Sequence, residues 1–209
     1  MILKVPFFEQ ERSLTCGVAV LRMILSFYGE KVTEKELAKK VKMHSFGTYS
    51  TDLAVLAMEK GYKTTAYTLH LPLFASLNLS FGTRITLDHF QKIKLPPGHK
   101  FTFQTCKNYV EKGGELIWEQ PKINRVQSWL DKKNPVFISA NTAALNTYWK
   151  SWHNGHYYII EGYDEENAYV INPDCDKKDA RYKIPWEKLL PAWSINAAQS
   201  SDHLMAIYK

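Results

Sequence analysis

The segment from Cys16 to Tyr28 (CGVAVLRMILSFY) constrains the fold most, because it is apolar on nearly every side of a helix. Arg22 and Ser26 are its only clearly polar members, and Gly29 follows as a natural C-terminal stop. A helix with so little polar surface has to be covered by other elements on most of its faces. We therefore expect this helix in the centre of the fold.

Further helices are expected near the start of the chain and strands near its end. Thr33 and Glu36 form a capping-box pattern, and Asp164 to Asn167 is a hairpin turn between two apolar segments. The predicted helices are 34–41, the segment from 50 to Gly61, 122–133 and 185–190; the predicted strands are 62–68, 135–140, 156–163, 168–172 and 204–208. Helices followed by antiparallel strands predict an α+β fold.

The middle of the chain, from about Leu71 to Gln120, is the hardest part to interpret. It contains LPL, LPPG and KGG and only short mixed segments. We expect an insertion or cap here, with short strands and one or two short helices. The length of 209 residues suits one well-buried domain, so we predict a single domain over residues 1–209.

Composition argues against several partners. The net charge is +6, but the basic residues are scattered, which is typical of a solvated surface, and we expect no nucleic-acid partner. No apolar run is long enough to cross a bilayer, so no membrane contact is expected. The N-terminus lacks an apolar signal core, and three cysteines far apart are no disulfide framework; both features predict a cytoplasmic protein. The oligomeric state leaves no signal in the sequence.

Cys16 is the first candidate for chemistry, because it opens the apolar helix. Unpaired backbone N–H groups at a helix N-terminus favour a thiolate over a thiol. Gly17 beside it removes a side chain that could crowd a substrate, and the amide of Gln10 could donate to an oxyanion together with the Cys16 N–H. The alternative interpretation is a small apolar residue that starts a buried helix.

His156 is the second candidate. It opens an apolar strand, and Gly155 before it would leave open space beside the ring. Asn172 ends the next strand, so the hairpin would place its amide oxygen close enough to orient the imidazole. His156 could also be a core histidine, and Asp174 could replace Asn172 as the orienting group.

A metal cluster and aromatic binding residues are weaker hypotheses. His153 and His156 with Asp174 and Cys175 match no known zinc spacing, so no metal is expected. Three tryptophans are expected to fill the core or line the cleft: Trp152, Trp186 and Trp193.

These residues resemble a known family. The string VPFFEQERSLTCGVAVLRMILSFYG is similar to the cysteine peptidases that remove double-glycine leader peptides, which form family thirty-nine of the cysteine peptidases. That family has a Gln six residues before a Cys-Gly, and a His-led strand followed sixteen residues later by Asp-Pro. This chain has Gln10, Cys16, His156 and Asn172 at those spacings, over roughly residues 1–70 and 134–190. The resemblance implies a papain-like α+β fold, with the central N-terminal helix packed on an antiparallel sheet.

The resemblance also implies a thiol protease. Cys16 would be the nucleophile, His156 the base, Asn172 the orienting group and Gln10 an oxyanion donor, acting on a peptide or protein substrate without a cofactor. The family's acidic orienting residue is replaced by Asn172, as in papain. The same site could transfer the acyl group to an amine. A non-catalytic peptide-binding module of the same fold is the alternative.

A second resemblance is to small stand-alone proteins described as guanylyl cyclases. They share the patterns Q-x5-CG…RM-x-L, T-x-DLA-x-L and GH…GY…NP. In this chain these patterns read QERSLTCG…RMIL, STDLAVLAM and GHYYIIEGYDEENAYVINP. Nucleotide cyclisation normally needs metal-binding carboxylates and a phosphate cradle. Neither a P-loop nor a paired-Asp motif is present in the sequence, so a nucleotide enzyme is the less favoured alternative.

Overall fold

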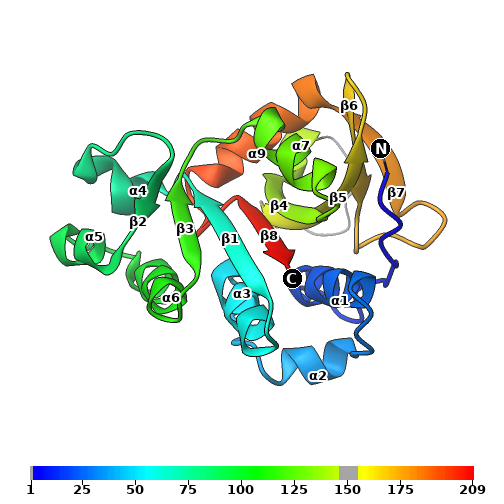
Figure 1. Ribbon diagram of the computed structural model, residues 1–209, viewed down its shortest axis with the longest axis horizontal. Helices are drawn as coiled ribbons and strands as arrows, with labels where there is room; N and C mark the ends of the chain where they lie inside the picture. Colours follow the sequence, from blue (N-terminus) through cyan, green and yellow to red (C-terminus); the bar gives the residue numbers. More distant parts are fainter. Residues whose placement is uncertain (1, 146–154) are drawn as a thin grey trace.

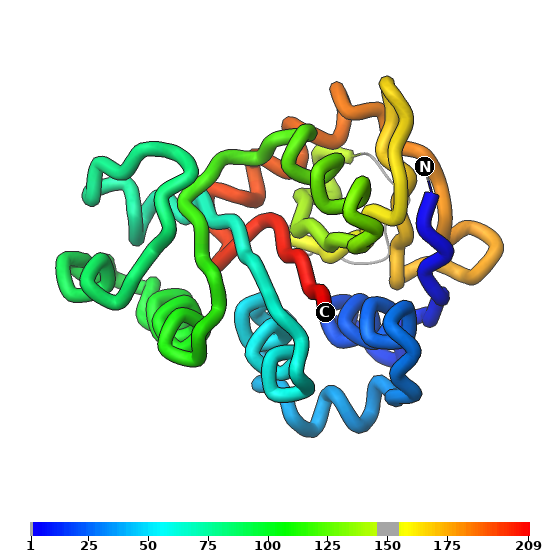
Figure 2. The backbone as a smooth tube through the Cα atoms, viewed as in Figure 1, coloured from blue at the N-terminus to red at the C-terminus, as the bar shows by residue number. Residues whose placement is uncertain are grey.

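A computed structural model describes residues 2–145 and 155–209 (Figures 1 and 2). The fold is mixed α+β, as predicted. Its helices are α1 (Cys16–Phe27), α2 (Glu34–Ala38), α3 (Ser50–Glu59), α4 (Leu71–Phe74), the 3₁₀ helix η1 (Ala75–Leu77), α5 (Leu87–Lys92), α6 (Lys100–Glu111), α7 (Ile123–Asp131), α8 (Thr142–Leu145) and α9 (Trp186–Ala197). Its strands are β1 (Lys63–Thr68), β2 (Thr83–Ile85), β3 (Glu115–Trp118), β4 (Val136–Asn141), β5 (Gly155–Tyr163), β6 (Asn167–Ile171), β7 (Arg181–Pro185) and β8 (Leu204–Tyr208).

Within the described residues the strands form one eight-stranded sheet in the order β2-β3-β1-β8-β4-β5-β6-β7. Neighbouring strands are antiparallel except for β1 and β3, which pair in parallel. In strand β1, the consecutive residues Thr64 to Thr68 are all buried. The reason is its central place between β3 and β8, with α3 packed against it.

The central position predicted for α1 is confirmed. Eight of its residues, from Gly17 to Leu25, are buried, and the helix packs against β5, α2 and α3 (Figure 1). Gly29 ends it with φ of 92°, a conformation that glycine adopts without strain. The C-terminal strand ends beside it, because the Tyr28 hydroxyl donates to the Ile207 carbonyl at 2.8 Å.

Helix α9 is longer than the predicted segment 185–190. Pro191 lies inside it, but Leu189, Ala192 and Trp193 continue a buried face against β4, β6 and β7. Packing of this face outweighs the hydrogen bond that the proline removes. Trp193 and Trp186 are buried, so both fill the core as expected.

The middle segment adds two strands to the main sheet. Strand β3 pairs with β1, β2 pairs with β3, and α6 packs against β3 and α3 (Figure 1). Helix α6 spans twelve residues and was not anticipated at that length. Its buried residues are Thr102, Thr105, Cys106 and Tyr109. They have helical spacing, but two of them are threonines, so the sequence shows no clear apolar face.

The hairpin of β5 and β6 positions the candidate site. Ile159 pairs with Ile171, so His156, near the start of β5, and Asn172, directly after β6, lie at the same end of the hairpin. A register irregularity between Ile160 and Gly162 lies farther along, toward the turn. In residues 2–145 and 155–209, none of the helices has the length and apolar character needed to span a bilayer.

Candidate active site

A strained turn presents Cys16 at the start of α1. Leu14 has φ of 72°, in the left-handed region that residues other than glycine rarely adopt. The Thr15 hydroxyl donates to the Arg12 carbonyl at 2.8 Å and holds the turn. The chain therefore enters the helix with Cys16 as its first residue.

Gly17 serves packing as well as access. A Cβ atom built at this position would clash with Thr48 Oγ1 and would lie 2.9 Å from Leu53 Cδ1 and 3.1 Å from Tyr157 Cδ2. The glycine thus lets α1 approach α3 and β5 closely. The sequence had suggested only room for a substrate; the structure gives a second and sufficient reason.

Burial has the largest effect on the pKa of Cys16. It raises the pKa of the thiol to about 11, although hydrogen bonds from backbone groups of Tyr157 and Gly17 lower it; the negative charge of Asp174 raises it further. The expected thiolate preference at the helix N-terminus is therefore outweighed by desolvation. At a pKa of about 11, the thiol form of Cys16 prevails at neutral pH.

His156 and Asn172 lie side by side at the end of the hairpin. His156 Nε2 and Asn172 Oδ1 are 2.7 Å apart, and both side chains are buried. Burial lowers the pKa of His156 to about 4, while the bond to Asn172 acts in the opposite direction. The imidazole is therefore neutral at pH 7 and able to accept a proton.

The contacts of Asn172 define which imidazole nitrogen is basic. Its Oδ1 also accepts the Asp174 N–H at 3.0 Å, and its Nδ2 donates to Cys175 Sγ at 3.1 Å, so the amide orientation is fixed. Because Oδ1 only accepts, Nε2 of His156 carries the hydrogen and Nδ1 carries the lone pair. The contact with Asn172 thus fixes the orientation of the ring.

Gln10 is joined to the loop that follows β6. Its backbone N–H donates to the Pro173 carbonyl at 2.9 Å, and its Nε2 donates to Asp174 Oδ1 at 2.8 Å. Cys16 in turn is hydrogen-bonded by the backbone of Tyr157, the residue after His156. These hydrogen bonds therefore link the neighbourhoods of Gln10, Cys16, His156 and Asn172 into one region, although these residues come from both ends of the chain.

A cavity of about 290 Å³ opens beside Cys16. Its lining carries aromatic and uncharged polar groups, and the Thr48 hydroxyl in its wall is buried with no hydrogen-bond partner among the described residues. The lining includes Cys16, Phe46, Tyr49, Tyr157, Asn196 and Ser201. The geometry thus offers a pocket for part of a ligand directly beside Cys16.

Several of these lining residues could not be found from the sequence. Tyr157 lies next to His156, but Asn196 comes from the end of α9 and no motif marks it. Gly155 was expected to leave open space; a Cβ there would lie only 3.0 Å from Asn196 Oδ1, so the glycine accommodates α9 instead.

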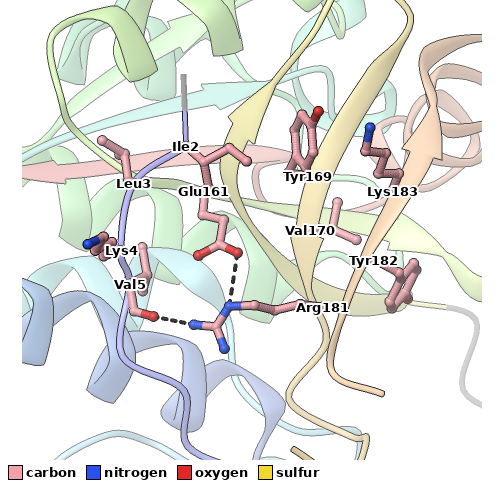
Figure 3. A pocket seen from close by; sticks show the side chains of 10 residues that line it. All are labelled: Ile2, Leu3, Lys4, Val5, Glu161, Tyr169, Val170, Arg181, Tyr182 and Lys183. Atoms are coloured by element: carbon pink, nitrogen blue, oxygen red, sulfur yellow. Dashed lines mark hydrogen bonds and ion pairs between the residues drawn. The ribbon is translucent and has the colours of Figure 1, made fainter. Parts of the chain in front are cut away.

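A second and larger cavity, of about 490 Å³, lies away from these residues, between the N-terminal segment and strands β5 to β7 (Figure 3). Arg181 bridges it: the guanidinium donates to Glu161 Oε1 at 3.0 Å and to the Val5 carbonyl (Figure 3). These bonds tie down the N-terminal segment that leads to Gln10. The cavity contains none of the predicted catalytic residues.

The structure describes only part of the hypothesised metal cluster. Among the described residues, no group of three or more His, Cys, Asp or Glu side chains is arranged to hold an ion. His153 and Trp152, named above in the metal and aromatic hypotheses, lie outside the described residues.

The family can be assigned by comparison. The model of the Peptidase_C39 like family matches residues 2–201, and the chain therefore belongs to this family of peptidases. No curated protein matches significantly.

Solved structures of the same fold support the assignment. A proposed C39-like peptidase from Bacillus anthracis has a TM-score of 0.58 and 19% identity, covering 100% of this chain and 96% of that one. A double glycine motif protease from an AMS/PCAT transporter, solved in complex with the leader peptide, has a TM-score of 0.51 and 15% identity, covering 99% and 93%. The peptidase domain of Streptococcus ComA, a bi-functional ABC transporter involved in quorum sensing, has a TM-score of 0.51 and 13% identity, covering 96% of each chain.

Proposed function

We propose that this protein is a cysteine peptidase that cleaves a peptide or amide bond, with Cys16 as nucleophile and His156 as base. The observation that carries the proposal is the 2.7 Å contact between His156 Nε2 and Asn172 Oδ1. His156 lies near the start of β5, and the backbone of the next residue, Tyr157, hydrogen-bonds Cys16. A thiol, an oriented neutral imidazole and an amide donor are the parts that thiol acyl transfer requires.

In the proposed acylation, His156 Nδ1 takes the thiol proton and the sulfur attacks the carbonyl carbon. The carbonyl oxygen becomes an oxyanion, which the Cys16 N–H and the Gln10 carboxamide stabilise. When the tetrahedral intermediate collapses, the C–N bond breaks and the imidazolium gives its proton to the leaving amine. A thioester on Cys16 remains.

Deacylation reverses these roles. His156 removes a proton from water, the hydroxide adds to the thioester carbonyl, and the thiol leaves with the proton from the imidazolium. An amine in place of water would transfer the acyl group instead. Burial keeps the imidazole neutral before each step, while its lowered pKa also makes it a weaker base.

The proposed substrate is a peptide or a protein segment. One structural relative was solved with a leader peptide bound, which motivates the choice of a peptide for this chain. The uncharged lining of the cavity beside Cys16 suits an uncharged side chain close to the scissile bond. The cytoplasmic location inferred from the sequence stays a prediction.

The test uses p-nitrophenyl acetate as an acyl donor and measures the pre-steady-state release of p-nitrophenolate. We expect a burst that matches the enzyme concentration in the wild-type chain. Cys16→Ser and His156→Ala should reduce its rate by at least about 10³-fold and 10²-fold respectively. Cys106→Ser, at a buried thiol outside the site, and His89→Ala, in α5, are the matched controls and should retain it.

Two outcomes would overturn the proposal. A burst that survives Cys16→Ser would place the nucleophile elsewhere. A folded wild-type chain that shows no burst and no acetylated Cys16 by mass spectrometry would instead indicate the non-catalytic binding module.

A further inference from the structure

The turn formed by residues 172–175 (Asn-Pro-Asp-Cys) contacts both halves of the proposed site. Through Asn172 it holds His156, and through Pro173 and Asp174 it holds Gln10. Figure 2 shows the N-terminal segment running beside the loop that follows β6, where this turn lies. The oxyanion donor and the base are therefore positioned by one short stretch of chain.

The contact between Asp174 and Gln10 has a defined polarity. A carboxylate only accepts hydrogen bonds, so it fixes the Gln10 carboxamide with Nε2 toward Asp174, 2.8 Å away. Rotating the amide by half a turn would bring its oxygen against the carboxylate. Since Nε2 has two hydrogens, one occupies Asp174 and the other is available to a second acceptor.

We propose that Asp174 is a positioning residue of the reaction, which orients Gln10 Nε2 so that its second hydrogen stabilises the oxyanion beside Cys16. The inference rests on the proposed function and adds a residue to it. Asp174 acts through Gln10, whereas Asn172 acts through His156. The double attachment of Gln10, by its backbone N–H to Pro173 and by its side chain to Asp174, restricts its rotamers before any substrate binds.

The charge of Asp174 makes this role separable from a direct effect on the sulfur. Its negative charge raises the pKa of the Cys16 thiol and so disfavours the thiolate. Removing the charge should therefore leave thiolate chemistry at Cys16 equal or faster. Loss of Gln10 orientation should slow only reactions that pass through an oxyanion.

Two reactions of the same sulfur test the difference. Acylation by p-nitrophenyl acetate forms a tetrahedral oxyanion before p-nitrophenolate leaves, whereas alkylation by iodoacetamide displaces iodide and forms none. We expect Asp174→Ala to slow acylation about tenfold, which is less than the roughly 10²–10³-fold loss expected when such a donor is removed completely. Asp174→Asn should slow it less, because an amide oxygen still accepts from Gln10. Alkylation of Cys16 should not slow in either variant.

A double-mutant cycle tests whether the effect passes through Gln10. In a Gln10→Ala background, Asp174→Ala should slow acylation by less than about twofold further, because the group that it positions is gone. Asp176→Asn, an exposed carboxylate in the same loop, is the matched control and should leave both rates unchanged.

Each of these measurements can overturn the positioning role of Asp174. Equal slowing of acylation and alkylation by Asp174→Ala, or full additivity with Gln10→Ala, would overturn the positioning role while leaving the peptidase proposal intact. Unchanged acylation in Asp174→Ala would do the same. A wild-type chain without acylation would remove the proposed function, and this inference with it.

Discussion

Replacement of Asp202 by Asn should change how stability depends on pH. Asp202 is buried between α9 and β8 and accepts hydrogen bonds from the Ser50 and Ser201 hydroxyls. Burial raises its pKa from 3.8 to about 7, although those two hydrogen bonds act in the opposite direction. The native state thus keeps a proton that the unfolded chain has lost between these two pH values.

The sign and size follow from proton linkage. Below about pH 4 the carboxyl is protonated in both states and burial carries no charge penalty. As pH rises through about 7, the folded state must ionise a buried group, so stability is lost. The difference between 3.8 and about 7 corresponds to roughly 4 kcal/mol of unfolding free energy.

Urea unfolding followed by tryptophan fluorescence at pH 4.5, 6 and 8 measures this. Relative to the wild-type chain, Asp202→Asn should gain roughly 3 kcal/mol between pH 4.5 and pH 8, because part of the full difference is already lost at pH 4.5. His70, His156 and His203, whose pKa values burial lowers to about 4, oppose the trend in each protein and cancel in the difference.

The exposed Asp176→Asn variant is the control and should track the wild-type chain. A constant difference between Asp202→Asn and wild type across the whole pH range would refute the reasoning, because it would mean that Asp202 ionises alike in both states.

Three further predictions follow from the geometry of the site and its support. Because burial raises the pKa of the Cys16 thiol to about 11, its iodoacetamide rate should rise about tenfold per pH unit between pH 6.5 and 8.5; a rate that is flat over this range would contradict a resting thiol. Gly17→Ala should lower the unfolding free energy by about 1–3 kcal/mol, since the new Cβ meets Thr48; an unchanged urea midpoint would show that the contact relaxes. Arg181→Ala should lower the unfolding free energy by about 1–3 kcal/mol at pH 7, because it leaves Glu161 buried without its partner. The loss should be smaller at pH 4.5, because burial raises the pKa of Glu161 and lets its carboxyl take a proton. Equal losses at both pH values would argue against an unpaired charge as the cause.

The position of the candidate site follows from two local patterns in the chain. An apolar helix that begins at Cys16 and a hairpin that begins at His156 each depend on neighbours along the sequence. Once the hairpin forms, Asn172 must lie near the start of β5, because pairing fixes register. These features could therefore be predicted from spacing alone, and the family match agrees with the fold that they implied.

The edges of the sheet were harder to predict. Strand β7 was missed because only Ile184 of its five residues is buried, so it carries no clear alternation. Strands β2 and β3 are only three and four residues long and lie in the segment without periodicity. Short edge strands are defined by the strand beside them more than by their own side chains.

The sequence by itself determined the central helix, most of the longer strands, the hairpin and the residue types that can carry thiol chemistry, since these depend on contacts between near neighbours in the chain. Only the tertiary structure decided that β8 lies between β1 and β4, that Asp174 contacts Gln10, and that burial raises the pKa of Cys16 and lowers the pKa of His156. The physical reason is that desolvation and strand order depend on groups brought together from distant parts of the chain, such as Gln10 and Asp174, 164 residues apart.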